Sequence, residues 1–419
     1  AISLTGSSST LANAKGWGLW LAGSNVTSTS GNITLTSNGN AANTTEFIFA
    51  AGAVTSTSGA VLLKTSSTPG TATFTSGSLN SDASVTVQAY APTVTALTLG
   101  GSGAKVFESP NGTDSFASAF SNANLTTSST SSSVRIGRIS NNVDVTGAGQ
   151  LQALGNIHVY GKNISATAGI TSSNAGGAVL LKATADISLT GGVSATRRVI
   201  QTNAGPITLW SDSDNSGAGA INLANFSTLN SAGGSVLSAT AGGQITLAGG
   251  SDANADGLPD GYATGNSTGN TNGVILGTIA YVANSINVHS GTSGITVRGQ
   301  SAFGRGTYIT PGSTIVAGDA IWLEGSSSGG TSNYFHGLAI SDAPSASTSG
   351  SIISAKTTGA AITLIGNTTN SGTTNPAYGV MLNPNGGASF IAMLRATGGG
   401  DINITGSSAV AGIPGVFLA

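Results

Sequence analysis

The chain has 419 residues and a formal net charge of −2, and its composition excludes several classes of function. Only 7% of the residues are charged, against about 25% in an ordinary soluble domain, so the basic surface that nucleic-acid binding requires is missing. The absence of cysteine excludes disulfides and cysteine-based metal or redox sites. No apolar run approaches the ~18 residues of a transmembrane helix.

Disorder is also a poor description of this composition. Hydrophobic residues make up 39% of the chain, which is enough to bury a long core. They occur as short islands of Ile, Leu and Val in a background of Gly, Ser, Thr and Asn. This distribution favours many short strands over helices.

The first residues of the chain read like an internal segment. Residues 1–8 show no basic region followed by an apolar stretch, so they do not have a signal-peptide pattern. They match a later segment, Asp401–Ser408, instead. We therefore expect the chain to be part of something longer, and its terminal coils to be covered by further chain or by a second copy stacked head to tail.

A short two-faced unit recurs along the chain. It has an apolar, a polar and an apolar residue, usually followed by a small polar residue or glycine. Copies include ISLTG from residue 2, ITLTS from 33, ITLWS from 207, ITLAG from 245, ITVRG from 295, IWLEG from 321, ITLIG from 362 and INITG from 402. Each unit has the period of one strand with one buried face.

These repeats determine the expected fold. A single unit offers too few apolar side chains to form a core alone, so neighbouring units must stack. In the copy at 245, the alternation places Ile245 and Leu247 inward and Thr246 outward. With Asn and Gly as turn residues between strands, the sequence predicts an all-β parallel β-solenoid, in the form of a right-handed β-helix.

One segment interrupts the pattern, so we expect β-helix coils over 1–100, an irregular excursion over 101–140, and β-helix coils with lateral loops over 141–419. In the excursion, Phe116 and Phe120 are four residues apart behind the possible caps Thr113 and Asp114. This spacing predicts one short helix. Further insertions around 251–272 and 331–333 should project sideways.

An acidic loop is the sharpest local signal. In SDANADGLPDGY, Asp252, Asn254 and Asp256 alternate, the Leu258 carbonyl follows, and Asp260 closes the series. Oxygen ligands at every second residue of a tight loop can converge on a calcium ion. The spacing resembles the calcium loops of thrombospondin type-3 repeats, which implies Ca²⁺ bound by these five residues. The alternative is an ordinary Asp/Asn/Gly turn.

Three tryptophans alternate with inward residues and are therefore predicted to lie outside. They are Trp20, Trp210 and Trp322. Outward indoles can stack on sugar rings or against a neighbouring solenoid. The alternative is that neighbouring loops cover them, because large aromatic side chains are usually mostly buried.

Signals for an enzyme are weaker. Asp212 and Asp214 are close in sequence, but they fall in a Ser/Asn/Gly segment that is typical of a solvated turn. His158, His289 and His336 are dispersed, without metal-ligand spacing, and we expect them on the surface. No hydrolase, phosphate-loop or zinc-protease motif is present.

The strand units, the linking TSTSG and AGG turns and the lack of cysteine resemble the repeats of filamentous-haemagglutinin-like exoproteins, the bacterial adhesins secreted by the two-partner route. The resemblance implies an extracellular or cell-surface rod with a structural or adhesive role and no catalytic residue. We expect it to bind glycans or other rods. Two alternatives remain open: a carbohydrate-active β-helix lyase or glycosidase, and an ice- or mineral-binding protein built on Thr ladders.

Overall fold

The computed structural model confirms an all-β parallel β-solenoid. All regular structure among the described residues is β-strand, and the strand pairs are parallel. No helix in this part of the chain is long and apolar enough to cross a membrane. The described residues are 1–7, 19–38, 45–56, 61–65, 71–81, 84–88, 96–100, 104–107, 124–127, 134–136, 144–147, 151–153, 155–190, 192, 196–233, 240–266, 269–278, 286–329, 335–340, 350–369, 377–382 and 392–418.

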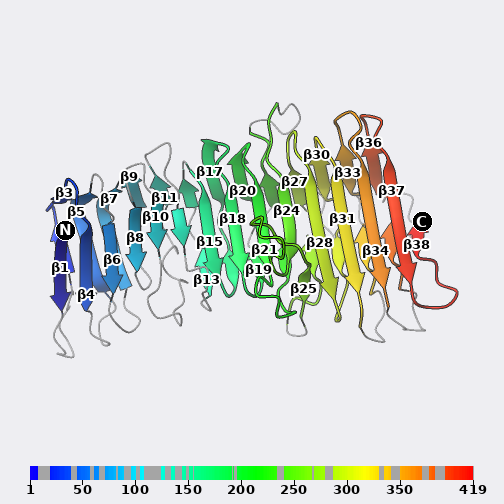
Figure 1. Ribbon diagram of the computed structural model, residues 1–419, viewed down its shortest axis with the longest axis horizontal. Coiled ribbons are helices and arrows are strands. Elements are labelled where there is room, and N and C mark those ends of the chain that lie inside the picture. Colours follow the sequence, from blue (N-terminus) through cyan, green and yellow to red (C-terminus); the bar gives the residue numbers. More distant parts are fainter. Residues whose placement is uncertain are drawn as a thin grey trace. The chain divides into compact units, whose positions relative to one another are not determined.

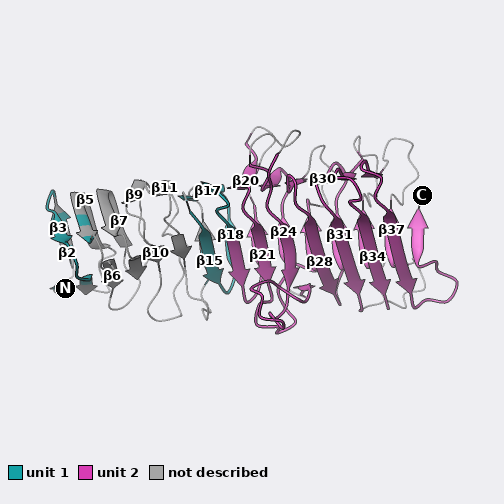
Figure 2. Cartoon of the chain, turned by 45° about the horizontal axis from the view of Figure 1, so that its top comes forward, with its two compact units in different colours: residues 1–179 teal, residues 180–419 magenta. Residues whose placement is uncertain are grey.

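The chain divides into two units, residues 1–179 and 180–419 (Figure 2). In unit 1 the strands of successive coils lie side by side in three parallel sheets (Figure 1). The first sheet contains β1 (Ile2–Ser7), β4 (Ile33–Asn38), β6 (Val61–Thr65), β8 (Ser84–Gln88), β10 (Ala104–Phe107), β12 (Val134–Ile136) and β15 (Ile157–Gly161). The second contains β2 (Leu19–Ala22), β3 (Val26–Ser28), β5 (Thr45–Ser56), β7 (Thr71–Ser81), β9 (Ala96–Gly100), β11 (Asn124–Thr127), β14 (Leu151–Ala153) and β17 (Ile170–Ala175). The third contains β13 (Val145–Gly147) and β16 (Ile164–Ala166).

Unit 2 repeats the same three-sheet plan. Sheet A, which carries the candidate site, contains β18 (Val179–Ala183, in unit 2 from Leu180), β21 (Ile207–Ser211), β24 (Ile245–Gly249), β25 (Ala263–Gly265), β28 (Ile295–Ser301), β31 (Ile321–Ser327), β34 (Ile362–Thr368) and β37 (Ile402–Ser408). Sheet B contains β20 (Arg198–Asn203), β23 (Ser227–Asn230), β27 (Ile286–His289), β30 (Thr314–Ala317), β33 (Ile352–Ala355) and β36 (Met393–Ala396). Sheet C contains β19 (Ile187–Leu189), β22 (Ile221–Leu223), β26 (Val274–Leu276), β29 (Thr307–Ile309), β32 (Leu338–Ile340), β35 (Val380–Leu382) and β38 (Val416–Leu418).

The repeat unit sets the register of sheet A. β28, β31, β34 and β37 pair over seven residues each, with the first Ile of every unit aligned. The inward side chains therefore form continuous aliphatic ladders. Ile321, Leu323, Ile362 and Leu364 are each at most 1% exposed. This burial, repeated in each coil, supplies the main apolar stabilisation of the unit.

The outward threonines do not form one uniform exposed ladder. Thr363 is partly exposed, but Thr208 and Thr246 are only 6% exposed. In β21 and β24 every residue is buried, whereas β28 alternates between buried and partly exposed positions. Alternation from the sequence gives the direction of a side chain, but covering segments decide its exposure.

The sequence predicts an irregular excursion without strands over 101–140, and this prediction is wrong. β10, β11 and β12 fall within this range and pair in register with strands of the neighbouring coils. Their apolar content is short and irregular, so the period-two signal is weak even though backbone pairing continues. The helix expected around Phe116 and Phe120 lies outside the described residues, as does the lateral loop expected at 331–333.

Two columns of glycine bring sheets A and C into direct backbone contact. The first runs through Gly299, Gly325, Gly366 and Gly406, which are paired across β28, β31, β34 and β37. The second runs through the residues that directly precede the strands of sheet C, namely Gly306, Gly337, Gly379 and Gly415. A Cβ built on a glycine of the first column would lie 1.9 to 2.3 Å from a carbonyl oxygen of the second. None of these glycines has the left-handed backbone expected of turn residues, so their role is close approach.

Candidate functional site

A lateral segment, residues 250–262, crosses the outward face of sheet A between β24 and β25. Its two ends are held together as an antiparallel bridge between Gly249 and Gly261, with the Gly261 amide donating to the Gly249 carbonyl at 2.9 Å. Positive φ angles at Gly250, Ala255 and Gly257 allow the sharp bends. The sequence predicts a lateral insertion at 251–272; within these bounds the structure has β25 (Ala263–Gly265), which pairs with β28.

Carboxylates of the lateral segment bind its own backbone. The two oxygens of Asp252 accept hydrogen bonds from the amides of Asp256 and Gly257, each at 3.0 Å. Asp260 accepts from the amide of Asn254 at 3.0 Å and from its side chain at 3.1 Å. These bonds join residues four to six positions apart and close the segment on itself.

This arrangement differs from a gathered calcium site. Asp256 is itself used as an acceptor by the Leu258 amide at 2.8 Å, and the Asn254 side-chain oxygen accepts from the Asp256 amide. Across the described ranges, no group of three or more His, Cys, Asp or Glu side chains gathers so that it could hold a metal ion. Calcium binding by the five residues therefore stays a prediction.

The lateral segment is attached to sheet A at both of its ends. At its start, the Trp210 indole nitrogen donates to the Gly250 carbonyl at 2.7 Å. Near its end, Nη1 of Arg298 donates to the Asp260 carbonyl at 2.5 Å. Because both donors project outward from strands of sheet A, they anchor the backbone of the segment to the solenoid.

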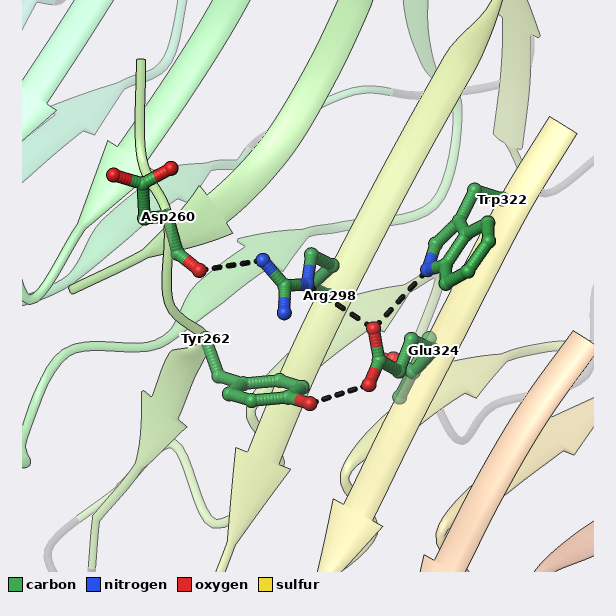
Figure 3. A network of polar contacts seen from close by, with 6 residues as sticks. Asp260, Tyr262, Arg298, Trp322 and Glu324 are labelled. Atoms are coloured by element: carbon green, nitrogen blue, oxygen red, sulfur yellow. Dashed lines mark hydrogen bonds and ion pairs between the residues drawn. The ribbon is translucent and has the colours of Figure 1, made fainter. Parts of the chain in front are cut away.

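Glu324 is the centre of the third attachment (Figure 3). One carboxylate oxygen accepts from the Tyr262 hydroxyl, and the other accepts from Nε of Arg298 and from the Trp322 indole, each at 3.1 Å. The lateral segment, two neighbouring strands and an indole thus meet at one carboxylate. Charge-assisted bonds of this kind are stronger than neutral ones.

The site is partly shielded from water. The side chains of Arg298 and Glu324 are 26% and 11% exposed, and the guanidinium carbon lies 4.7 Å from the centre of the Tyr262 ring. Burial and the neighbouring Glu324 raise the pKa of the Tyr262 hydroxyl, while Arg298 acts in the opposite direction. The hydroxyl therefore stays protonated and keeps donating to the carboxylate at neutral pH.

Trp210 is buried, so its expected place on an exposed surface is wrong. The side chain does project outward from β21, but the lateral segment covers it and leaves it 2% exposed. The Lys182 ammonium lies 3.4 Å from the centre of its ring. Burial lowers the pKa of Lys182, and the nearby charge of Asp252 partly offsets that effect.

Trp322 remains on the surface. It is 40% exposed, and its indole nitrogen is held by Glu324, two residues along the same strand. The hydrogen bond fixes the ring against β31 while leaving part of it open to solvent. The side chain of Trp20 lies outside the described part of the chain, so its expected exposure stays a prediction.

Asp212 is not part of a solvated turn. It is 1% exposed and accepts hydrogen bonds from the Gly217 amide at 3.0 Å and the Thr264 hydroxyl at 2.9 Å. Its backbone has a φ of 48°, in the left-handed region. Asp214 is exposed, as expected, and caps the Ser216 amide.

Two of the three histidines are buried, which corrects the expectation that all lie on the surface. His289, on an outward position of β27, is 8% exposed, and burial together with Lys356 and Arg197 lowers its pKa to about 4. His336 is fully buried before β32, stacks on Tyr378 with ring centres 5.6 Å apart, and has its pKa lowered to about 3 by burial and Arg305. Both rings are neutral at pH 7.

Sequence reasoning missed Arg298, Glu324 and Tyr262. A usable signal for the first two exists, because ITVRG and IWLEG place them at the same position of consecutive repeat units, and they pair directly across β28 and β31. Tyr262 reaches them only through the path of the lateral segment. Chemically, the three side chains satisfy one another and serve to position Trp322 and the segment.

Comparisons of this chain with protein-family models, with curated proteins and with solved structures find no match.

Proposed function

We propose that this protein is a structural and adhesive β-solenoid of a bacterial surface or extracellular fibre, and that it catalyses no reaction. The observation that carries the proposal is the stacking of sheet A, in which consecutive coils pair in register over seven residues above fully buried ladders. Such a stack gives a stiff axis and repeats its outward surface with the spacing of the strands, ~4.8 Å.

The polar groups at the site support a binding role over a catalytic one. Both oxygens of Glu324 are occupied by donors from neighbouring side chains, and both oxygens of Asp212 are also used as acceptors. A glycosidase needs two carboxylates that are free to exchange protons or attack a sugar. Carboxylates held in this way act instead as structural acceptors.

The repeat pattern supports an extracellular or cell-surface location. The strand units and their linking turns resemble those of filamentous-haemagglutinin-like exoproteins, which are secreted adhesins. We accordingly place the protein outside the cell or on its surface, with glycans or other solenoids as its partners.

Self-association is a second part of the proposal. The coil formed by β36, β37 and β38 exposes apolar side chains at inward positions: Ile402 is 43% and Leu418 61% exposed. The aligned Ile321 and Ile362 of earlier coils are buried. A second copy stacked on this coil would bury these side chains in the same way.

One experiment separates an adhesin from an enzyme. The intact protein is incubated with a panel of surface polysaccharides, and bound polysaccharide and chain length are measured on the same samples. We expect retention of at least one polysaccharide with its chain length unchanged. The appearance of shortened chains or of unsaturated sugar ends would contradict the proposal and favour a glycosidase or a lyase.

A further inference from the structure

Trp322 lies in a row of outward side chains that runs across the strands of sheet A. Its neighbours in register are Thr296 on β28 and Thr363 on β34, and Asn403 on β37 follows Thr363. Thr296 and Thr363 are partly exposed, and Asn403 is exposed. We call these four residues the Trp322 row. It places one indole among hydroxyl and amide groups on an open sheet face.

The indole is held in place before any ligand arrives. Its nitrogen donates to Glu324 at 3.1 Å, and Glu324 is in turn held by Arg298 and by Tyr262 of the lateral segment (Figure 3). An aromatic side chain fixed in this way loses little conformational freedom on binding. A ring that is 40% exposed and still fixed is suited to stacking.

The chemistry of the row indicates which kind of ligand fits. The charge of Arg298 is paired with Glu324, and the four residues of the row are uncharged, so the row itself offers no charge to an ionic ligand. A protein interface favours a cluster of apolar and aromatic side chains at its centre, whereas the in-row neighbours of Trp322 are Thr and Asn. An ice- or mineral-binding face needs identical side chains in every coil, and the row is mixed.

From these observations we infer that the Trp322 row binds a neutral saccharide chain, with one pyranose ring stacked on the indole and hydroxyl groups bonded to the flanking Thr and Asn side chains. The chain would run across the strands, because the coil spacing of ~4.8 Å is close to the length of one sugar ring. This inference rests on the proposed adhesive function and assigns its ligand class and site.

Glu324 acts as a positioning residue in this site. Its carboxylate orients the indole without having to touch the sugar, since its oxygens already accept from three protein donors. Replacing it should loosen the ring and weaken binding, while removal of the indole itself should abolish stacking. The two effects differ in size, which makes them separable.

The test uses the full chain and neutral hexasaccharides of glucose, mannose, xylose and N-acetylglucosamine, with titration calorimetry and indole fluorescence as readouts. We expect at least one hexasaccharide to bind, a loss of at least tenfold in affinity for Trp322→Ala, and a smaller loss for both Trp322→Phe and Glu324→Gln. Phe303→Ala is the matched control, because Phe303 is 46% exposed but lies outside the row. The affinity of Phe303→Ala for the hexasaccharide should equal that of the unmodified protein.

Several results would overturn the inference. They are equal affinity in Trp322→Ala and the unmodified protein, equal losses in Trp322→Ala and Phe303→Ala, and no binding of any hexasaccharide. An indole signal that changes with protein concentration alone would assign the row to a second copy. In each case the proposed adhesive function still holds if the protein retains polysaccharide without shortening it. Cleavage of the hexasaccharides would contradict the proposed function itself.

Discussion

Gly366 and Gly379 approach so closely that a Cβ built on Gly366 would lie 1.9 Å from the Gly379 carbonyl oxygen. Gly366 lies in β34 and Gly379 directly precedes β35, so the contact joins sheets A and C within one coil. The same contact recurs between Gly325 and Gly337 at 2.0 Å. Glycine at these positions is a packing requirement that each coil repeats.

Gly366→Ala should therefore be strongly destabilising. The new methyl group collides with backbone, which cannot move without separating two sheets, so we expect a loss of about 3 kcal/mol in the free energy of unfolding. Gly359→Ala adds the same methyl group at an open position with φ of 78° and should cost about 1 kcal/mol. Denaturant unfolding of both variants measures the difference. Equal losses would contradict the packing role.

Glu324→Gln tests the centre of the site. The amide group turns one acceptor into a donor facing Arg298, Trp322 or Tyr262, so we expect a loss of about 2 kcal/mol in stability. Indole fluorescence should also shift to longer wavelength as Trp322 becomes more mobile. The control is Asp319→Asn, which changes an exposed carboxylate on the same unit. An unchanged spectrum and stability for Glu324→Gln would show that the network is dispensable.

The free energy of unfolding should fall as the pH is lowered, because of His289 and His336. Their pKa values in the folded protein, about 4 and about 3, lie below the 6.5 of an unfolded histidine. The unfolded state therefore binds more protons below pH 6.5. The contribution is complete above pH 6.5 and is lost as the pH falls toward 4 and 3, by about 3 kcal/mol for His289 and about 5 kcal/mol for His336.

The measurement for this prediction compares unfolding free energies at pH 7 and pH 4.5. His289→Gln should flatten the pH dependence, because a neutral side chain replaces one that must be charged in the unfolded state. Asn287→Gln, which changes a side chain of the same strand that does not titrate, is the control and should leave the slope unchanged. Carboxylates also titrate in this range, but their contribution cancels between protein and variant. An identical slope in His289→Gln would contradict the prediction.

Calcium binding at the lateral segment is tested by titration calorimetry of the intact protein and of Asp256→Ala. If Asp252, Asn254, Asp256 and Asp260 bind the ion, heat should appear in the unmodified protein and vanish in the variant. The change in global stability should be small. Calcium at ten times its dissociation constant adds only about 1.4 kcal/mol. Absence of heat in both proteins would leave the segment as a self-closed acidic turn.

Self-association is tested by sedimentation at increasing protein concentration. Ile402→Ser makes an exposed apolar position of β37 polar, and it should lower the mass of the associated species. Thr405→Ser, at an exposed outward position of the same strand, is the control and should associate like the unmodified protein. A species that remains monomeric at every concentration would contradict stacking between copies.

The sequence by itself determined the repeating architecture. The alternation in ITLAG and IWLEG specifies which side chains point inward, and Ile245, Leu247, Ile321 and Leu323 are all buried. Strand direction and register also follow, because only parallel in-register stacking keeps apolar positions on one face in every coil. These features depend on local period and composition, which a linear sequence displays directly.

The tertiary structure alone decided what covers the outward face. Trp210 and Trp322 have the same alternation, yet the lateral segment covers the first at 2% exposed and leaves the second at 40%. The path of that segment depends on contacts to Arg298 and Glu324, which lie far from it along the chain. Periodicity records the direction of a side chain from its own strand, but exposure depends on which distant backbone packs above it.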